Sequence, residues 1–114
     1  MSQMSIGYDI KFNNGLIVPI NTITSNHVIS ATSGTNSSND YIISVNTQNA
    51  ITITLPSDSS LVNGRTYIIN SVVENPNVTI SGGTISGSTS VTLTGSYNSI
   101  QIIYNSSLNS WIVI

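Results

Sequence analysis

Residues that favour strands over helices dominate this sequence, and this bias limits the possible fold more than any other feature. Isoleucine and valine account for 28 of the 114 residues, whereas leucine contributes 5 and alanine 2. Side chains branched at Cβ lose rotamer freedom in a helix and pack well on a pleated sheet. Good helix formers are scarce, and no stretch has apolar residues at helical spacing. The sequence therefore predicts an all-β protein.

Strand-like segments recur about every 8–12 residues and are separated by Gly, Pro and Asn. A chain of 114 residues is the length of one domain. Short strands at this spacing are typical of an antiparallel β-sandwich with jelly-roll-like topology, which is the fold that we predict for residues 1–114. The pattern of residues 1–24 is looser, so this segment is a candidate N-terminal arm. The strands predicted beyond it are 41–45, 50–55, 65–73, 78–81, 91–94, 99–104 and 111–114.

Three of these segments share an alternation of apolar and hydroxyl residues. They begin at residues 51, 78 and 91, so the two spacings between them are 27 and 13 residues. A β-solenoid is expected to repeat at a constant period. The unequal spacing therefore favours outer strands with one face in water over a solenoid.

Charged residues make up only 5% of the chain, with 2 basic and 4 acidic side chains, against about 25% in an average domain. Two basic residues cannot neutralise several phosphates or bind an anionic membrane, so neither nucleic acid nor membrane is an expected partner. No apolar run approaches the roughly 20 residues of a membrane span, and residues 1–4 lack the features of a signal peptide. A net charge of −2 gives little repulsion between copies, which favours homo-oligomers.

The sequence offers few groups for catalysis or metal binding. It contains no cysteine and one histidine, His27, and its acidic residues Asp9, Asp40, Asp58 and Glu74 stand apart from one another. No nucleophile elbow of the Gly-x-Ser-x-Gly type is present. We therefore predict a protein that is not an enzyme, with no catalytic residues, metal site or cofactor.

Four predicted strands, 41–45, 65–73, 99–104 and 111–114, have apolar residues on both faces. A two-layer domain of this size has a single interior, so one of these faces needs another cover. A contact between subunits would supply it. The residues predicted to form this subunit interface are Ile42, Ile68, Val72, Ile103 and Ile112.

Ligand binding is the alternative to a purely structural role. Tyr97 lies in a turn with Asn98, where an aromatic side chain would be exposed and could stack on a sugar. The strand patterns place Tyr67, Tyr104 and Trp111 in the core instead. Tyr97 and Asn98 are therefore the candidate ligand-binding residues, with a glycan as the candidate ligand.

From about residue 41 to its end, the chain carries a series of short segments in a familiar order. They are ITITLP at 51–56, NGRTYIIN at 63–70, VTI at 78–80, GG at 82–83, ISG at 85–87, YNSIQIIYN at 97–105 and WIVI at 111–114. This series resembles the short β-rich modules at the tips of trimeric phage tail fibres and in structural proteins of giant DNA viruses. The resemblance implies a homotrimeric virion or appendage component that folds as a β-sandwich or jelly roll.

Taken together, the composition and the resemblance predict a non-enzymatic structural protein of a viral particle or fibre. Its expected location is the virion, and its expected partners are copies of itself, as a trimer, and other virion proteins. The alternative is a module that binds a glycan or a host receptor.

Overall fold

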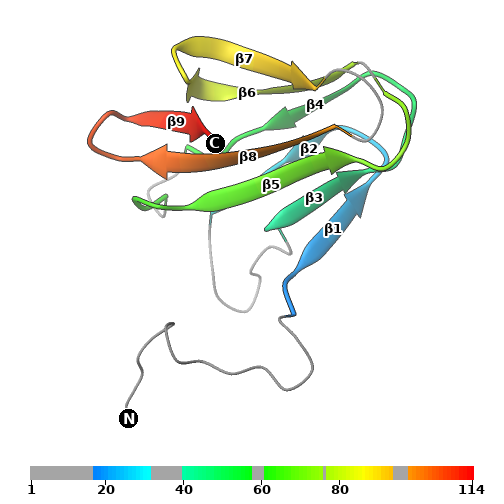
Figure 1. Cartoon of the computed structure of the whole chain (residues 1–114), viewed down its shortest axis with the longest axis horizontal. Helices are drawn as coiled ribbons and strands as arrows, with labels where there is room; N and C mark the ends of the chain where they lie inside the picture. Colours follow the sequence, from blue (N-terminus) through cyan, green and yellow to red (C-terminus); the bar gives the residue numbers. More distant parts are fainter. Residues whose placement is uncertain (1–16, 32–39, 58–60, 76, 94–97) are drawn as a thin grey trace.

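The computed structural model describes residues 17–31, 40–57, 61–75, 77–93 and 98–114, and these form nine strands (Figure 1). The all-β prediction is confirmed, and each strand predicted from residue 41 onward overlaps an observed one. No helix within the described ranges is long and apolar enough to cross a membrane. The strands are β1 (Ile20–Ile23), β2 (His27–Val28), β3 (Ile42–Val45), β4 (Ile51–Thr54), β5 (Thr66–Ser71), β6 (Val78–Ile85), β7 (Ser88–Leu93), β8 (Ser99–Asn105) and β9 (Ser110–Val113).

The strands form one hydrogen-bonded sheet in the order β1-β3-β5-β8-β9-β6-β4-β2, and β7 pairs with β6 outside this path. Antiparallel pairing, which the sequence predicted throughout, is wrong for five of the eight pairs. The parallel pairs are β1 with β3, β3 with β5, β2 with β4, β4 with β6, and β6 with β9. Antiparallel pairing is limited to β5 with β8, β6 with β7, and β8 with β9. This order does not establish the predicted sandwich or jelly roll.

Alternate strands stack on one another because the chain winds between two layers (Figure 1). Strands β1, β3 and β5 lie side by side in one layer, and β2, β4 and β6 in the other. Residues 20–85 therefore make three turns of a short parallel coil, each with one strand in either layer. The partners in register are Ile20, Ile42 and Ile68 in the first layer, and His27, Ile53 and Ile80 in the second.

This winding corrects our rejection of a solenoid. Residues 51–54 and 78–81 pair in parallel register on successive turns, at an offset of 27 residues. Residues 91–93 instead run back antiparallel on β6 as part of a hairpin. The spacing of 13 residues is thus a hairpin and not a turn of the coil, which is why the sequence showed no constant period. The outer faces of the three segments do carry hydroxyl groups, as predicted.

The hydrophobic core lies between the two layers. Ile43 and Ile69 from one layer and Ile53 and Ile80 from the other are fully buried. Beyond the third turn, β8 and β9 cover the core with aromatic and aliphatic side chains. Trp111 lies 5.8 Å from Tyr67 and 5.2 Å from Tyr104, measured between ring centroids. The core is therefore aliphatic in its middle and aromatic at the end covered by β8 and β9.

A bulge in β6 lets this strand serve two neighbours. The pairing of β6 with β7 shifts register between Ser81 and Ile85, and Gly82 within this stretch has a φ of +104°. Before the bulge β6 pairs with β4, and after it Ile85 pairs with Trp111 of β9. Glycine adopts positive φ without the steric cost of a side chain. The Gly82-Gly83 pair, which the sequence suggested as a break between strands, is therefore a bend within one strand.

The first prediction concerns Arg65, the residue before β5. Its backbone N–H donates to the carbonyl of Val62 at 3.1 Å, and its carbonyl accepts from the Tyr104 N–H at 2.9 Å. Proteases cleave segments that open locally, and a backbone tied into the sheet opens rarely. We expect trypsin to cut the folded protein slowly after Arg65, as followed by mass spectrometry. Rapid cleavage at this bond would contradict the placement of β5; Lys11 lies outside the described residues.

Candidate functional site

The first turn of the coil has polar residues at positions where the next turns have isoleucine. Asn21 is the register partner of Ile43, and His27 is the partner of Ile53. Both isoleucines are fully buried. Strands β1 and β2 are the two ends of the sheet path, so Asn21 and His27 lie where the core reaches its open end.

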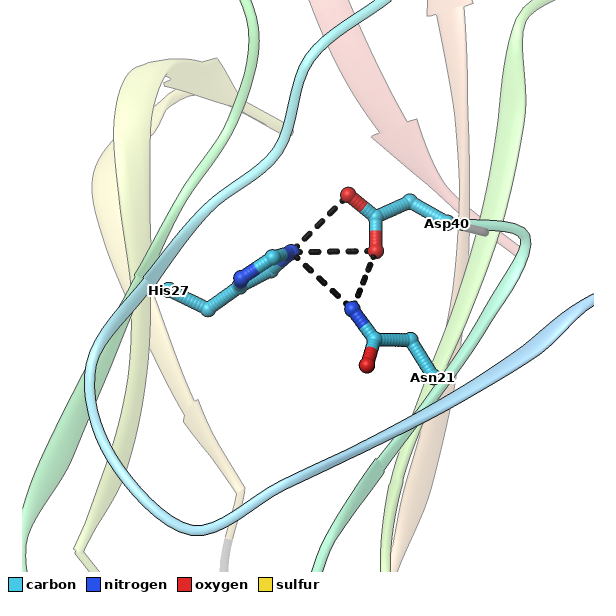
Figure 2. Close-up of polar contacts among 3 residues, drawn as sticks. All are labelled: Asn21, His27 and Asp40. Carbon is cyan, nitrogen blue, oxygen red and sulfur yellow. Dashed lines mark hydrogen bonds and ion pairs between the residues drawn. The ribbon is translucent and has the colours of Figure 1, made fainter. Parts of the chain in front are cut away.

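Asp40 joins these two residues, as Figure 2 shows. His27 Nε2 lies 2.8 Å from Asp40 Oδ2 and 3.0 Å from Oδ1, and Asn21 Nδ2 donates to Oδ1 at 2.9 Å. The Asp40 side chain is 2% exposed and that of His27 is 24% exposed. A carboxylate has only acceptors, so His27 donates through a hydrogen on Nε2. We refer to Asn21, His27 and Asp40 as the polar cap.

A histidine beside a buried carboxylate is part of the arrangement used in hydrolytic triads. Such a triad also needs a hydroxyl group on the other ring nitrogen. Within the described ranges, no serine or threonine hydroxyl is hydrogen-bonded to the His27 ring, and Asn21 and Asp40 both approach Nε2. The same ranges hold no group of three or more metal-ligating side chains of His, Cys, Asp or Glu. The geometry suits a polar closure of the core.

Sequence reasoning missed the polar cap because Asp40 and His27 are 13 residues apart and Asn21 is six residues before His27. Each looked isolated along the chain. The signal that could have found the cap is the offset between turns, which places Asn21 and His27 at isoleucine positions. That offset was hidden, as described above, by the hairpin of β6 and β7.

The residues predicted for the subunit interface lie on the outward side of the layer that contains β1, β3, β5, β8 and β9. Ile42 and Ile68 are neighbours across β3 and β5, and Ile103 and Ile112 are neighbours across β8 and β9. All four are partly exposed, and Val72, directly after β5, is 37% exposed. With Ile20, the register partner of Ile42, four of them form a continuous surface, which we call the apolar strip: Ile20, Ile42, Ile68, Ile103 and Ile112.

The structure engages Asn98 in local hydrogen bonds. Its carbonyl accepts from the Ser71 N–H at 3.0 Å, and its side-chain Oδ1 accepts from the Ser99 N–H, also at 3.0 Å. Asn98 thus connects the start of β8 to the end of β5. Tyr97, the other candidate ligand-binding residue, lies outside the described residues.

A pocket of about 340 Å³ opens beside Trp111, and we call it the Trp111 pocket. Sequence reasoning placed Tyr104 and Trp111 in the core. Trp111 is indeed buried, with 2% of its surface exposed, and Tyr104 is partly buried, but both also line this pocket. The sequence could not reveal the pocket because its walls come from separate segments. They are Pro56, Ser57, Leu61, Gly83, Thr84, Tyr104, Asn109 and Trp111.

Comparison with known proteins adds no family. No protein-family model matches the sequence, and no curated protein matches it significantly. The resemblance to phage tail-fibre tips and giant-virus structural proteins therefore rests on the sequence segments quoted above.

Proposed function

We propose that this chain is a non-enzymatic structural protein of a viral particle or fibre and that it assembles as a homo-oligomer, with a trimer as the expected form. The observation that supports this proposal is the apolar strip. Its five isoleucines lie on the outward side of one layer, while the inward side of the same layer already fills the core. The resemblance described above supports the virion as its location.

A second copy of the chain is the natural cover for the apolar strip. Every member is an uncharged aliphatic side chain, and the net charge of the chain is only −2, so two copies can approach with little repulsion. Burial of apolar surface contributes about 25 cal/mol per Å². A stable contact needs about 800 Å² on each partner. The strip spans five strands and supplies the apolar centre of such a contact.

The opposite layer of the molecule has a different surface. On β4, β6 and β7, Thr52, Thr79 and Thr92 are neighbours in register, as are Thr54, Ser81 and Ser90. These hydroxyl groups keep the surface hydrated without charge. One face of the subunit is therefore suited to water and the other to contact with a copy, which supports a fixed orientation within an assembly.

The proposal is tested by the double substitution Ile68→Asn with Ile103→Asn. Each change removes about 1.5–3 kcal/mol of apolar burial from the contact. Association should weaken by at least about a hundredfold. We expect light scattering to show the native mass falling to that of the monomer, with unchanged circular dichroism.

The matched control is Thr52→Asn with Thr79→Asn on the hydroxyl-bearing face, which should remain oligomeric. An Ile68→Asn, Ile103→Asn protein that keeps its oligomeric mass would contradict the proposed interface. Loss of the folded state would do so too, because it would place these side chains in the core. A monomeric unmodified chain would contradict the proposed assembly altogether.

A further inference from the structure

We propose that the Trp111 pocket binds a neutral saccharide. This inference concerns a different part of the surface from the apolar strip and does not depend on oligomer formation. Its volume of about 340 Å³ lies within the range of small-molecule sites. The pocket collects residues from the segment after β4, from β6, from β8 and from the turn before β9.

The lining of the pocket favours an uncharged, polar ligand. None of its eight residues carries a charge at neutral pH, so neither a phosphate nor an ammonium group would find an ion-pair partner there. The lining combines hydroxyl groups of Ser57 and Thr84 and the amide of Asn109 with aromatic and aliphatic surface from Tyr104 and Leu61. Sugars present both hydroxyl groups and C–H faces, and they match this mixture.

Gly83 keeps one edge of the indole ring uncovered. A Cβ atom at this position would lie 3.3 Å from Trp111 Cδ1 and 3.5 Å from Nε1. Unlike Gly82, Gly83 does not have a positive φ, so its backbone does not require glycine. The missing side chain therefore leaves space above the ring, next to a residue whose backbone would accept alanine.

Tyr104 and Asn109 form a preorganised polar edge. The Tyr104 hydroxyl donates to Asn109 Oδ1 at 2.6 Å, which orients the amide. Its Nδ2 donors have no hydrogen-bond partner among the described residues, so they remain available to a ligand. The lone pairs of the Tyr104 hydroxyl can also accept from a sugar hydroxyl. Asn109 has a φ of +48°, a conformation that asparagine tolerates better than most residues.

Tryptophan fluorescence provides a direct test because Trp111 is the only tryptophan in the chain. The probes are the methyl glycosides of glucose, galactose, mannose and N-acetylglucosamine, titrated to millimolar concentrations. Glucuronic acid and glucosamine serve as charged comparators. A glycan array then distinguishes a free monosaccharide from a residue within a longer glycan. We expect a saturable change in emission with at least one neutral glycoside and weaker binding of the charged comparators.

Two variants connect this signal to the pocket. Gly83→Ala fills the space above the indole edge and should weaken binding at least about tenfold. Asn109→Gly removes the amide donors while easing the positive φ, so the fold is retained and binding should again weaken. Ser90→Thr, which adds a methyl group to the exposed outer face of β7, is the matched control and should bind like the unmodified chain.

Three results would overturn the inference. The first is the absence of a saturable response to every neutral glycoside and of binding on the array. The second is a response that Gly83→Ala and Asn109→Gly both leave unchanged. The third is equal or tighter binding of the charged comparators. None of these results bears on the native mass, so this inference and the proposed assembly can fail separately.

Discussion

Replacing Gly82 by alanine is expected to lower the free energy of unfolding by about 3 kcal/mol. The φ of +104° at this position is one that residues with a side chain rarely adopt. In addition, a Cβ atom would lie 2.9 Å from the backbone nitrogen of Leu55 and 3.0 Å from its carbonyl oxygen. The Leu55 N–H donates to the Ser81 carbonyl at 2.7 Å, so the clash falls on the hydrogen bonding between β6 and the end of β4.

The neighbouring glycine provides the matched control for this experiment. Gly83 lacks a positive φ, and its added Cβ would meet only the Trp111 side chain, at 3.3 Å. Gly83→Ala should therefore change stability by less than about 1 kcal/mol. Urea unfolding measures both variants. Equal losses for the two would contradict the bulge geometry, because the strain is then not specific to Gly82.

The strands themselves were predictable because their signal is local. Alternating apolar and polar residues identify a strand and its two faces within a few positions. For the same reason the sequence separated Ile42 and Ile68, which face outward, from Ile43 and Ile69, which are buried. Face assignment needs only the period of two residues and no knowledge of strand partners.

Strand pairing was not predictable in this way. Antiparallel pairing was inferred because strands that follow one another usually pair as hairpins. In this chain consecutive strands from β1 to β6 lie in opposite layers, and each pairs with the strand after next. Residues 51–54 and 78–81 carry the repeat that records this winding, but the similar segment in β7 belongs to a hairpin. Both the polar cap and the Trp111 pocket depend on such long-range pairing.

The second large effect is expected from Asp40→Ala, which should destabilise the protein by about 2–3 kcal/mol. The Asp40 carboxylate accepts hydrogen bonds from His27 at 2.8 Å and from Asn21 at 2.9 Å. Removing it leaves both donors at the end of the apolar core without that acceptor. Because His27 is 24% exposed, water can reach part of the cap and limit the loss.

Amide hydrogen exchange would show where this destabilisation acts. We expect Asp40→Ala to speed exchange mainly in β1 and β2, the strands that carry Asn21 and His27, and to leave β5 and β8 protected. Exchange rates that are unchanged in β1 and β2 would mean that the polar cap does not hold the first turn in place.

A compensated variant separates the polar chemistry of the cap from its position in the core. Asn21→Ile and His27→Ile extend the isoleucine rows of Ile43 and Ile53 by one turn, and Asp40→Leu removes the remaining charge. Replacing a buried polar cluster by apolar side chains of similar volume is often neutral or stabilising. The triple variant should therefore unfold within about 1 kcal/mol of the unmodified chain or above it, although Asp40→Ala alone is destabilising. A triple variant as unstable as Asp40→Ala would show that the hydrogen bonds of the cap, and not merely the filling of its space, stabilise the first turn.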